Sequence, residues 1–146
     1  MTEQIQEAPK KKKKMLIIIG KRKKAVARAI VQDGRGIIRI NSKSIDLIQP
    51  KYAQMRLKEP VIIAGDIAKK VNINVHVTGG GVWGQTDAAR TAIANALVQW
   101  NKDNKLKEMY TDYDRSLLVS DPRRTEPHKP SRSTAGPRRT KQQSKR

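Results

Sequence analysis

The chain of 146 residues carries 32 Lys and Arg against 13 Asp and Glu, so its formal net charge at pH 7 is +19. Its length argues for one domain. Hydrophobic residues make up 36% of the chain, and even with glycine added this share lies below that of an average globular chain, so the chain can form a small core but not a large one. The lack of cysteine excludes disulfides, Cys-ligated metal sites and thiol nucleophiles, while the charge excess indicates a polyanionic partner such as nucleic acid.

The two ends of the chain are the most basic segments. Residues 1–14 contain the unbroken run Lys10–Lys14, which predicts a disordered lysine-rich arm; a solvated arm and a nuclear-import-like signal both remain open for it. Residues 121–146 hold nine basic and two acidic residues, four of the seven prolines and one hydrophobic residue, Ala135. A segment of this composition cannot bury a core, so we expect an extended basic C-terminal tail that becomes ordered on a partner.

Residues 15–120 have the periodicities of a folded α/β domain, and the charge of the chain leads us to expect that this domain binds RNA. The apolar run Met15–Ile19 is too short for a membrane span or a signal-peptide core, which indicates a soluble, non-secreted protein. This run predicts a strand, either separate or continuous with the next one. Lys24–Gln32, the turn residues 33–36 and Ile37–Ile40 together predict a β-hairpin.

Helical turns are expected next along the chain. Ser44 is placed to cap a short helix that ends at Pro50, and further helical turns are predicted over Lys51–Lys58 and Pro60–Lys69. Residues 71–78 then alternate strictly between apolar and polar types, which predicts a strand with one buried face.

The second half of the domain predicts helices on this sheet. Apolar residues between Ala89 and Trp100 recur at i, i+3 and i+4, so the helix that carries them packs on the sheet and Trp100 belongs to the core. A further helix from about Asp103 and a strand near Leu117–Ser120 would complete a β-α-β crossover. We therefore expect an α+β fold, a single compact domain with a four- or five-stranded sheet and helices on one face.

A glycine-rich loop, Gly79-Gly80-Gly81, lies between the alternating strand and the following helix. Glycines allow close backbone approach to a phosphate, and free N–H groups at a helix start attract anions. A tight turn that needs positive φ angles would explain the same glycines. The loop lacks the Gly-Lys-Ser/Thr ending of a P-loop and a nearby acidic cluster for magnesium.

Lys21, Arg22, Lys23 and Lys24 are four consecutive cations at the entry of a predicted strand, which favours contact with phosphates; a lysine-protected edge strand is the alternative. Trp83 can stack on a base or cover the helix start. His76 and His128 have no partner at ligand spacing, so we predict no metal site, catalytic residue or cofactor.

Five blocks of sequence, in this order, closely resemble the family of small-subunit ribosomal protein nine in its archaeal form. They are GKRKKAVARA (20–29), the GRG turn with its asparagine (34–41), VTGGGVWGQTDAARTAIANAL (77–97), DRSLLVSDPRR (114–124) and the terminal QQSKR (142–146). The resemblance implies a structural protein of the small-subunit head in the cytoplasmic ribosome. It also implies a left-handed β-α-β crossover, an exception to the usual handedness.

The resemblance further implies the partners: small-subunit rRNA, P-site transfer RNA and neighbouring head proteins, with no membrane and no small-molecule substrate. The implied transfer-RNA contacts are the terminal residues Ser144, Lys145 and Arg146. The implied rRNA contacts are Lys21, Arg22, Lys23, Lys24, Gly79, Gly80, Gly81, Gln85, Arg123, Arg124, Arg138, Arg139 and Lys141.

Two other functions remain as alternatives. A small phosphotransferase would bind nucleotide saturably, yet magnesium-binding carboxylates are missing and fold alone does not carry function. A sequence-indifferent binder of nucleic acid or anionic membranes that uses its arms alone would not need its folded middle. The cations and glycines inside that middle argue against it.

Overall fold

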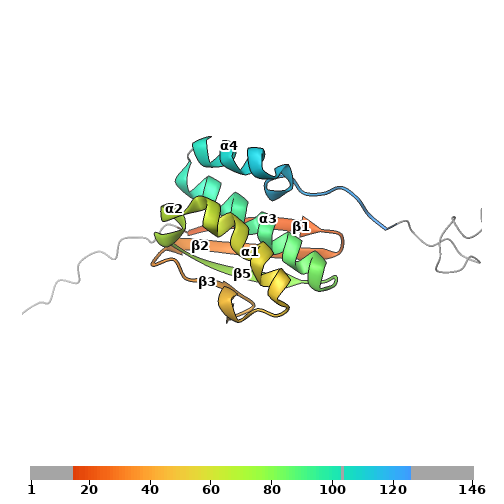
Figure 1. The fold of residues 1–146 in the computed structure, drawn as a ribbon. Helices are drawn as coiled ribbons and strands as arrows, with labels where there is room; N and C mark the ends of the chain where they lie inside the picture. The colour runs from red at the N-terminus through yellow and green to blue at the C-terminus, as the bar shows by residue number, and fades with distance from the viewer. Residues whose placement is uncertain (1–14, 103, 126–146) are drawn as a thin grey trace, which may run out of the picture.

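A computed structural model of the chain describes residues 15–102 and 104–125. In this part of the chain the strands form one mixed sheet in the order β1-β2-β5-β3-β4, with the helices over one face (Figure 1). This arrangement confirms the predicted single α+β domain. The elements are β1 (Met15–Arg22), β2 (Ala25–Asp33), β3 (Ile38–Ile40), β4 (Lys43–Ser44), η1 (Ile45–Leu47), α1 (Lys51–Ala64), α2 (Asp66–Lys69), β5 (Val71–Thr78), α3 (Val82–Asn101), α4 (Asn104–Tyr113) and η2 (Arg115–Leu117).

The predicted hairpin between Lys24–Gln32 and Ile37–Ile40 is wrong in its partners. β2 pairs antiparallel with β1 on one side and with β5 on the other, so β5 separates it from β3. The apolar run that starts at Met15 is a strand of its own and forms the hairpin with β2. Residues 33–36 therefore lead the chain from β2 to the other side of β5, where β3 pairs parallel with β5.

The β-α-β crossover lies earlier in the chain than predicted. Parallel strands β3 and β5 are joined through α1 and α2, whereas the expected strand near Leu117–Ser120 is absent from the described residues. Residues 115–117 form the 3-10 turn η2 instead, because the Asp114 side chain accepts a hydrogen bond from the Ser116 N–H and caps this turn. Leu117 is fully buried against the core from this turn.

The core lies between the sheet and helices α1 and α3. Val71, Ile73, Val75 and Val77 are buried as their alternation predicts, and α3 covers β1 and β2 with small residues. A Cβ at Gly20 would overlap the Ala88 carbonyl of α3, so this glycine permits the close approach of helix and strand. The open face of the sheet carries exposed apolar side chains of β1, including Ile17 and Ile19.

The helical segment before β5 is divided differently from the prediction. α1 continues through Pro60 to Ala64, and the break comes at Gly65, whose φ of 53° separates α1 from α2. Pro60 is buried, and its carbonyl oxygen accepts a 2.6 Å hydrogen bond from the Tyr110 hydroxyl, so tertiary packing outweighs the low helix propensity of proline.

Other local predictions differ in detail from the structure. Ser44 precedes η1, but its side chain makes no capping hydrogen bond, so the predicted short helix is a single 3-10 turn. Trp100 is partly buried and packs against the core from its edge rather than belonging to it. None of the helices in the described ranges combines the length and the apolar composition needed to cross a membrane.

Candidate nucleic-acid interface

The four consecutive cations lie in the tight turn between β1 and β2. Lys21 and Arg22 end β1, and because Arg22 pairs with Ala25, Lys23 and Lys24 form a two-residue turn. All three lysines are exposed. Lys23 has a φ of 54°, a left-handed conformation that is uncommon for residues with a side chain and favours glycine. A lysine is thus present where the backbone conformation favours glycine, a residue without a Cβ.

The glycine-rich loop lies against this turn. Gly79 and Gly80 have φ angles of 77° and 68°, and a Cβ built on Gly79 would lie 2.5 Å from the Lys24 carbonyl oxygen. The geometry of the turn therefore accounts for these two glycines. Gly81 differs, because its φ of −104° suits any residue and its missing Cβ faces open space. Its lack of a side chain leaves the start of α3 uncovered.

Two amide side chains hold this loop and the end of β5 in place. Gln85 donates a hydrogen bond from Nε2 to the Gly79 carbonyl at 3.2 Å, and its backbone N–H donates to Gly81 at 2.9 Å. Asn41 accepts from the Val77 N–H at 2.8 Å and donates to the Val77 carbonyl at 3.2 Å. Gln85 thus shapes the loop from within, and the comparable task of Asn41 was not predicted from the sequence.

Arg22 differs from its lysine neighbours because its side chain turns inward and is only 17% exposed. Its Nη1 lies 2.6 Å from Oδ2 of Asp121, and its Nε lies 3.6 Å from Oδ2 of Asp87 on α3. Asp87 also pairs with Arg56 of α1 at 3.3 Å. The charge of Arg22 is therefore compensated within the protein. Its ion pairs join the hairpin turn to α3 and to the start of the C-terminal tail.

Asp121 is the centre of a second set of contacts at the start of the tail. Its carboxylate accepts hydrogen bonds from the backbone N–H of Arg123 at 2.8 Å and from the Arg123 guanidinium at 2.6 to 3.1 Å. The hydrogen bonds from Arg123, reinforced by the charge of Arg22, lower the pKa of Asp121 to about 2. The carboxylate is thus ionised throughout the physiological pH range, while the Arg123 side chain stays 80% exposed.

The hairpin turn, the glycine loop and the start of the tail lie at one end of the domain (Figure 1). A shallow depression of about 260 Å³ lies between the turn and the tail, lined by Arg22, Lys23, Arg123, Arg124 and Thr125. Most of these cations are exposed, and the carboxylates nearest to them are already paired. This end of the domain, which we call the basic end (residues 21–24, 79–81 and 121–125), therefore presents an excess of positive charge.

A buried ion-pair network lies in the interior of the domain next to the basic end. Arg90 of α3 is 4% exposed, and its Nη2 lies 2.6 Å from Glu59 and 2.9 Å from Asp114. Burial alone would raise the pKa of Asp114, but hydrogen bonds from Ser116 and Arg90 outweigh burial and hold this pKa below its ordinary value. The network ties α1, α3 and η2 together and was not predicted, because sequence does not show which arginine of a basic chain is buried.

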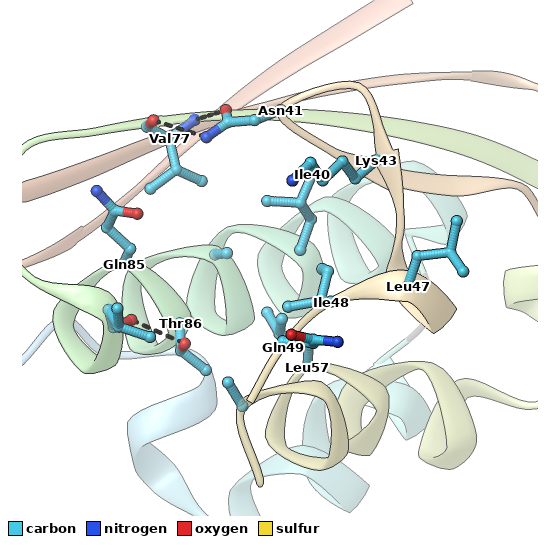
Figure 2. A pocket seen from close by; sticks show the side chains of 13 residues that line it. Ile40, Asn41, Lys43, Leu47, Ile48, Gln49, Leu57, Val77, Gln85 and Thr86 are labelled. Carbon is cyan, nitrogen blue, oxygen red and sulfur yellow. Dashed lines mark hydrogen bonds between the residues drawn. The ribbon is translucent and has the colours of Figure 1, made fainter. Parts of the chain in front are cut away.

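A pocket of about 520 Å³ is lined by residues from the end of β3, η1, α1, the end of β5 and the first half of α3 (Figure 2). Its polar groups are largely engaged within the protein: Asn41 bonds to Val77, Gln85 to Gly79, and the Thr86 hydroxyl donates to the Val82 carbonyl at 2.9 Å. The remaining lining is mostly aliphatic, and no carboxylate or histidine lines it. Among the described residues that line the pocket, Lys43 alone is charged.

The other predicted site residues are placed as follows. Trp83 is 52% exposed in the first turn of α3, beside the glycine loop, so it is not part of the core. His76 lies exposed on the open face of the sheet, and within residues 15–102 and 104–125 no three potential ligands gather as a metal site. The remaining predicted contacts lie outside the described residues: Arg138, Arg139, Lys141, Ser144, Lys145 and Arg146, as do the run Lys10–Lys14 and His128.

Comparison with known proteins gives a consistent result. The family model described as "Ribosomal protein S9/S16" matches residues 20–146. The chain is 54% identical over 125 residues to "Small ribosomal subunit protein uS9" of Methanococcus vannielii, which covers 86% of this chain and 93% of that protein. It is 51% identical, with the same coverage, to the protein of that name from Methanococcus maripaludis.

Proposed function

The chain belongs to the ribosomal protein S9 family in its archaeal form and is a structural component of the small ribosomal subunit, and from this premise we propose that the basic end is its rRNA-binding surface. As a member of this family it is located in the cytoplasmic ribosome, associates with rRNA and other ribosomal proteins, and is not an enzyme. The proposal concerns which of its residues contact RNA.

The observation that carries the proposal is the convergence of three separate chain segments at one end of the fold. The hairpin turn contributes Lys21, Lys23 and Lys24, and the tail contributes Arg123 and Arg124. The uncovered N-terminus of α3 contributes backbone N–H groups that favour anions. Cations and backbone donors of this kind suit the phosphates of an RNA backbone, and such contacts fix position without reading sequence.

A salt series tests this surface. Each neutralised phosphate contributes roughly −0.7 to −0.9 to the slope of log K against log salt. Substitution of Lys23 and Lys24 by Gln should therefore reduce the magnitude of the slope for small-subunit rRNA of M. maripaludis by about 1.4 to 1.8. The matched control replaces Lys69 and Lys70, two exposed lysines at the opposite end of β5, by Gln. Equal losses in both variants would contradict a localised surface.

We further propose that the terminal residues Ser144, Lys145 and Arg146 contact P-site transfer RNA, and that Arg138, Arg139 and Lys141 follow the rRNA. The support is the family resemblance together with the basic composition of residues 121–146. Cations at the chain terminus suit phosphate contacts that every transfer RNA offers.

A short truncation tests the transfer-RNA contact. Removal of residues 144–146 should weaken P-site transfer-RNA binding to reconstituted subunits, while incorporation of the protein into the subunit is unchanged. The folded domain and the proposed rRNA surface remain intact in this variant, so incorporation serves as its internal control. Unchanged transfer-RNA affinity would remove these residues from the proposed contact.

A further inference from the structure

Asp121 is an anion in the middle of a surface that is proposed to bind a polyanion. By charge alone this residue should weaken RNA binding. We infer that it does the opposite: Asp121 is a positioning residue that holds Arg123 and Arg124 beside Lys23, and so assembles one phosphate-binding cleft from two distant segments of the chain. This inference rests on the proposed rRNA-binding function and adds to it a residue that carries the wrong charge for direct contact.

Asp121 forms an ion pair with Arg22. The two side chains are 19% and 17% exposed and lie 2.6 Å apart. Ion pairs shielded from solvent to this extent are screened less by salt than pairs on the open surface. Arg22 is itself held by a second ion pair, because Asp87 of α3 pairs with both Arg22 and Arg56. Asp121 is therefore connected through Arg22 to helices α3 and α1 of the folded domain.

Asp121 also holds the residues that follow it in the chain. The same carboxylate accepts hydrogen bonds from the backbone and from the guanidinium of Arg123. These bonds fix the chain direction two residues beyond the anchor. They leave Arg123 80% exposed, and Arg123, Arg124 and Thr125 line the depression opposite Arg22 and Lys23. A phosphodiester group in this depression would meet cations from both segments.

Removal of Asp121 affects RNA binding in two opposite ways, through the net charge and through the order of the tail. Removal of Asp121 raises the net charge from +19 to +20, which slightly strengthens long-range attraction. It also frees the start of the tail, so that the backbone of this segment has to become ordered when RNA binds. Each residue that becomes ordered on binding lowers the affinity roughly 5- to 30-fold. Because ordering a single residue outweighs one screened charge, the variant should bind RNA less tightly.

The test compares Asp121→Ala with Asp112→Ala in the full chain. Asp112 is exposed on α4 and forms no ion pair with the residues that the structure describes, and both variants remove one negative charge. Binding to small-subunit rRNA of M. maripaludis is measured by filter retention at 0.15 M salt. We expect Asp121→Ala to lower the affinity roughly tenfold relative to Asp112→Ala. Equal or tighter binding by Asp121→Ala would overturn the inference.

A second readout works without RNA. Limited trypsin cleavage after Arg123 and Arg124, followed by mass spectrometry, should be several-fold faster in Asp121→Ala than in Asp112→Ala. Peptides of residues 118–128 with and without the substitution correct for the intrinsic preference of trypsin. Equal corrected rates would overturn the positioning role. Failure of the unaltered chain to bind rRNA would instead overturn the proposed function, and the cleavage rates would still decide the role of Asp121.

Discussion

Replacement of Gly79 by alanine perturbs the contact between the glycine loop and the hairpin turn. The φ of Gly79 is 77°, and the new Cβ would lie 2.5 Å from the Lys24 carbonyl oxygen, a backbone atom that cannot rotate away. The left-handed conformation costs a residue with a Cβ roughly 1–2 kcal/mol. Relief of the overlap by a shift of the backbone costs a further 1–2 kcal/mol or so.

The expected loss is therefore about 2–4 kcal/mol in the free energy of unfolding. This is a large part of the roughly 5–15 kcal/mol that stabilises a typical domain. In urea denaturation of the full chain, the midpoint should fall by about 1–2 M, since small proteins lose roughly 1–3 kcal/mol per molar urea. Binding of small-subunit rRNA should also weaken, because the turn that carries Lys23 and Lys24 is displaced.

Gly81→Ala is the matched control in the same loop. With a φ of −104° and nothing within 4 Å of its Cβ position, this substitution should change the free energy of unfolding by less than about 1 kcal/mol. It should still weaken rRNA binding, because the new methyl group lies where a phosphate approaches the start of α3. Equal stability of the two variants would refute the assignment of Gly79 to the turn geometry.

Four further predictions concern single residues. Tyr110→Phe removes the hydrogen bond to the buried Pro60 carbonyl and should cost about 1–2 kcal/mol in urea denaturation; an unchanged midpoint would contradict this. Arg90→Met removes the cation that pairs with Glu59 and Asp114 and should cost about 2–3 kcal/mol at pH 7; because the pKa of Asp114 is lowered in the folded state, this cost should become smaller as the pH falls below the ordinary range for aspartate. Lys23→Gly should leave stability equal or up to about 1 kcal/mol higher while rRNA binding weakens. The Asp121 carboxyl should titrate near pH 2 by NMR and higher in Arg123→Gln; since its pKa is lowered by folding, its contribution to stability holds above about pH 4 and disappears as pH falls through 2.

The fold could be predicted from the sequence wherever side-chain periodicity reports burial directly. The alternation in β5 and the apolar stripe of α3 fall into this class, because each side of these elements meets either the core or solvent. Strand pairing could not be predicted in the same way. β2 is buried on one face whether its neighbour is β1 or β3, so its residues carry no signal that distinguishes the two partners.

In the candidate site, too, some features could be predicted from the sequence and others could not. Runs of cations and glycines are visible in the sequence, and the structure brings Lys23, Gly79 and Arg123 to one end of the fold. The inward turn of Arg22 could not be predicted, because its partners Asp87 and Asp121 are 65 and 99 positions further along the chain. The signal was present only as Asp121, which is separated by one proline from the two arginines in DPRR and by itself suggests nothing more than a local ion pair.

The most direct test of the account is crosslinking of the full chain within archaeal small subunits, with the crosslinked peptides identified after a wash at high salt. RNA crosslinks are expected from the hairpin turn, the glycine loop and residues 121–125, and transfer-RNA crosslinks from the terminal peptide. Crosslinks spread evenly over the domain, with release of the protein at modest salt, would contradict this expectation and leave a polycation without a defined binding surface.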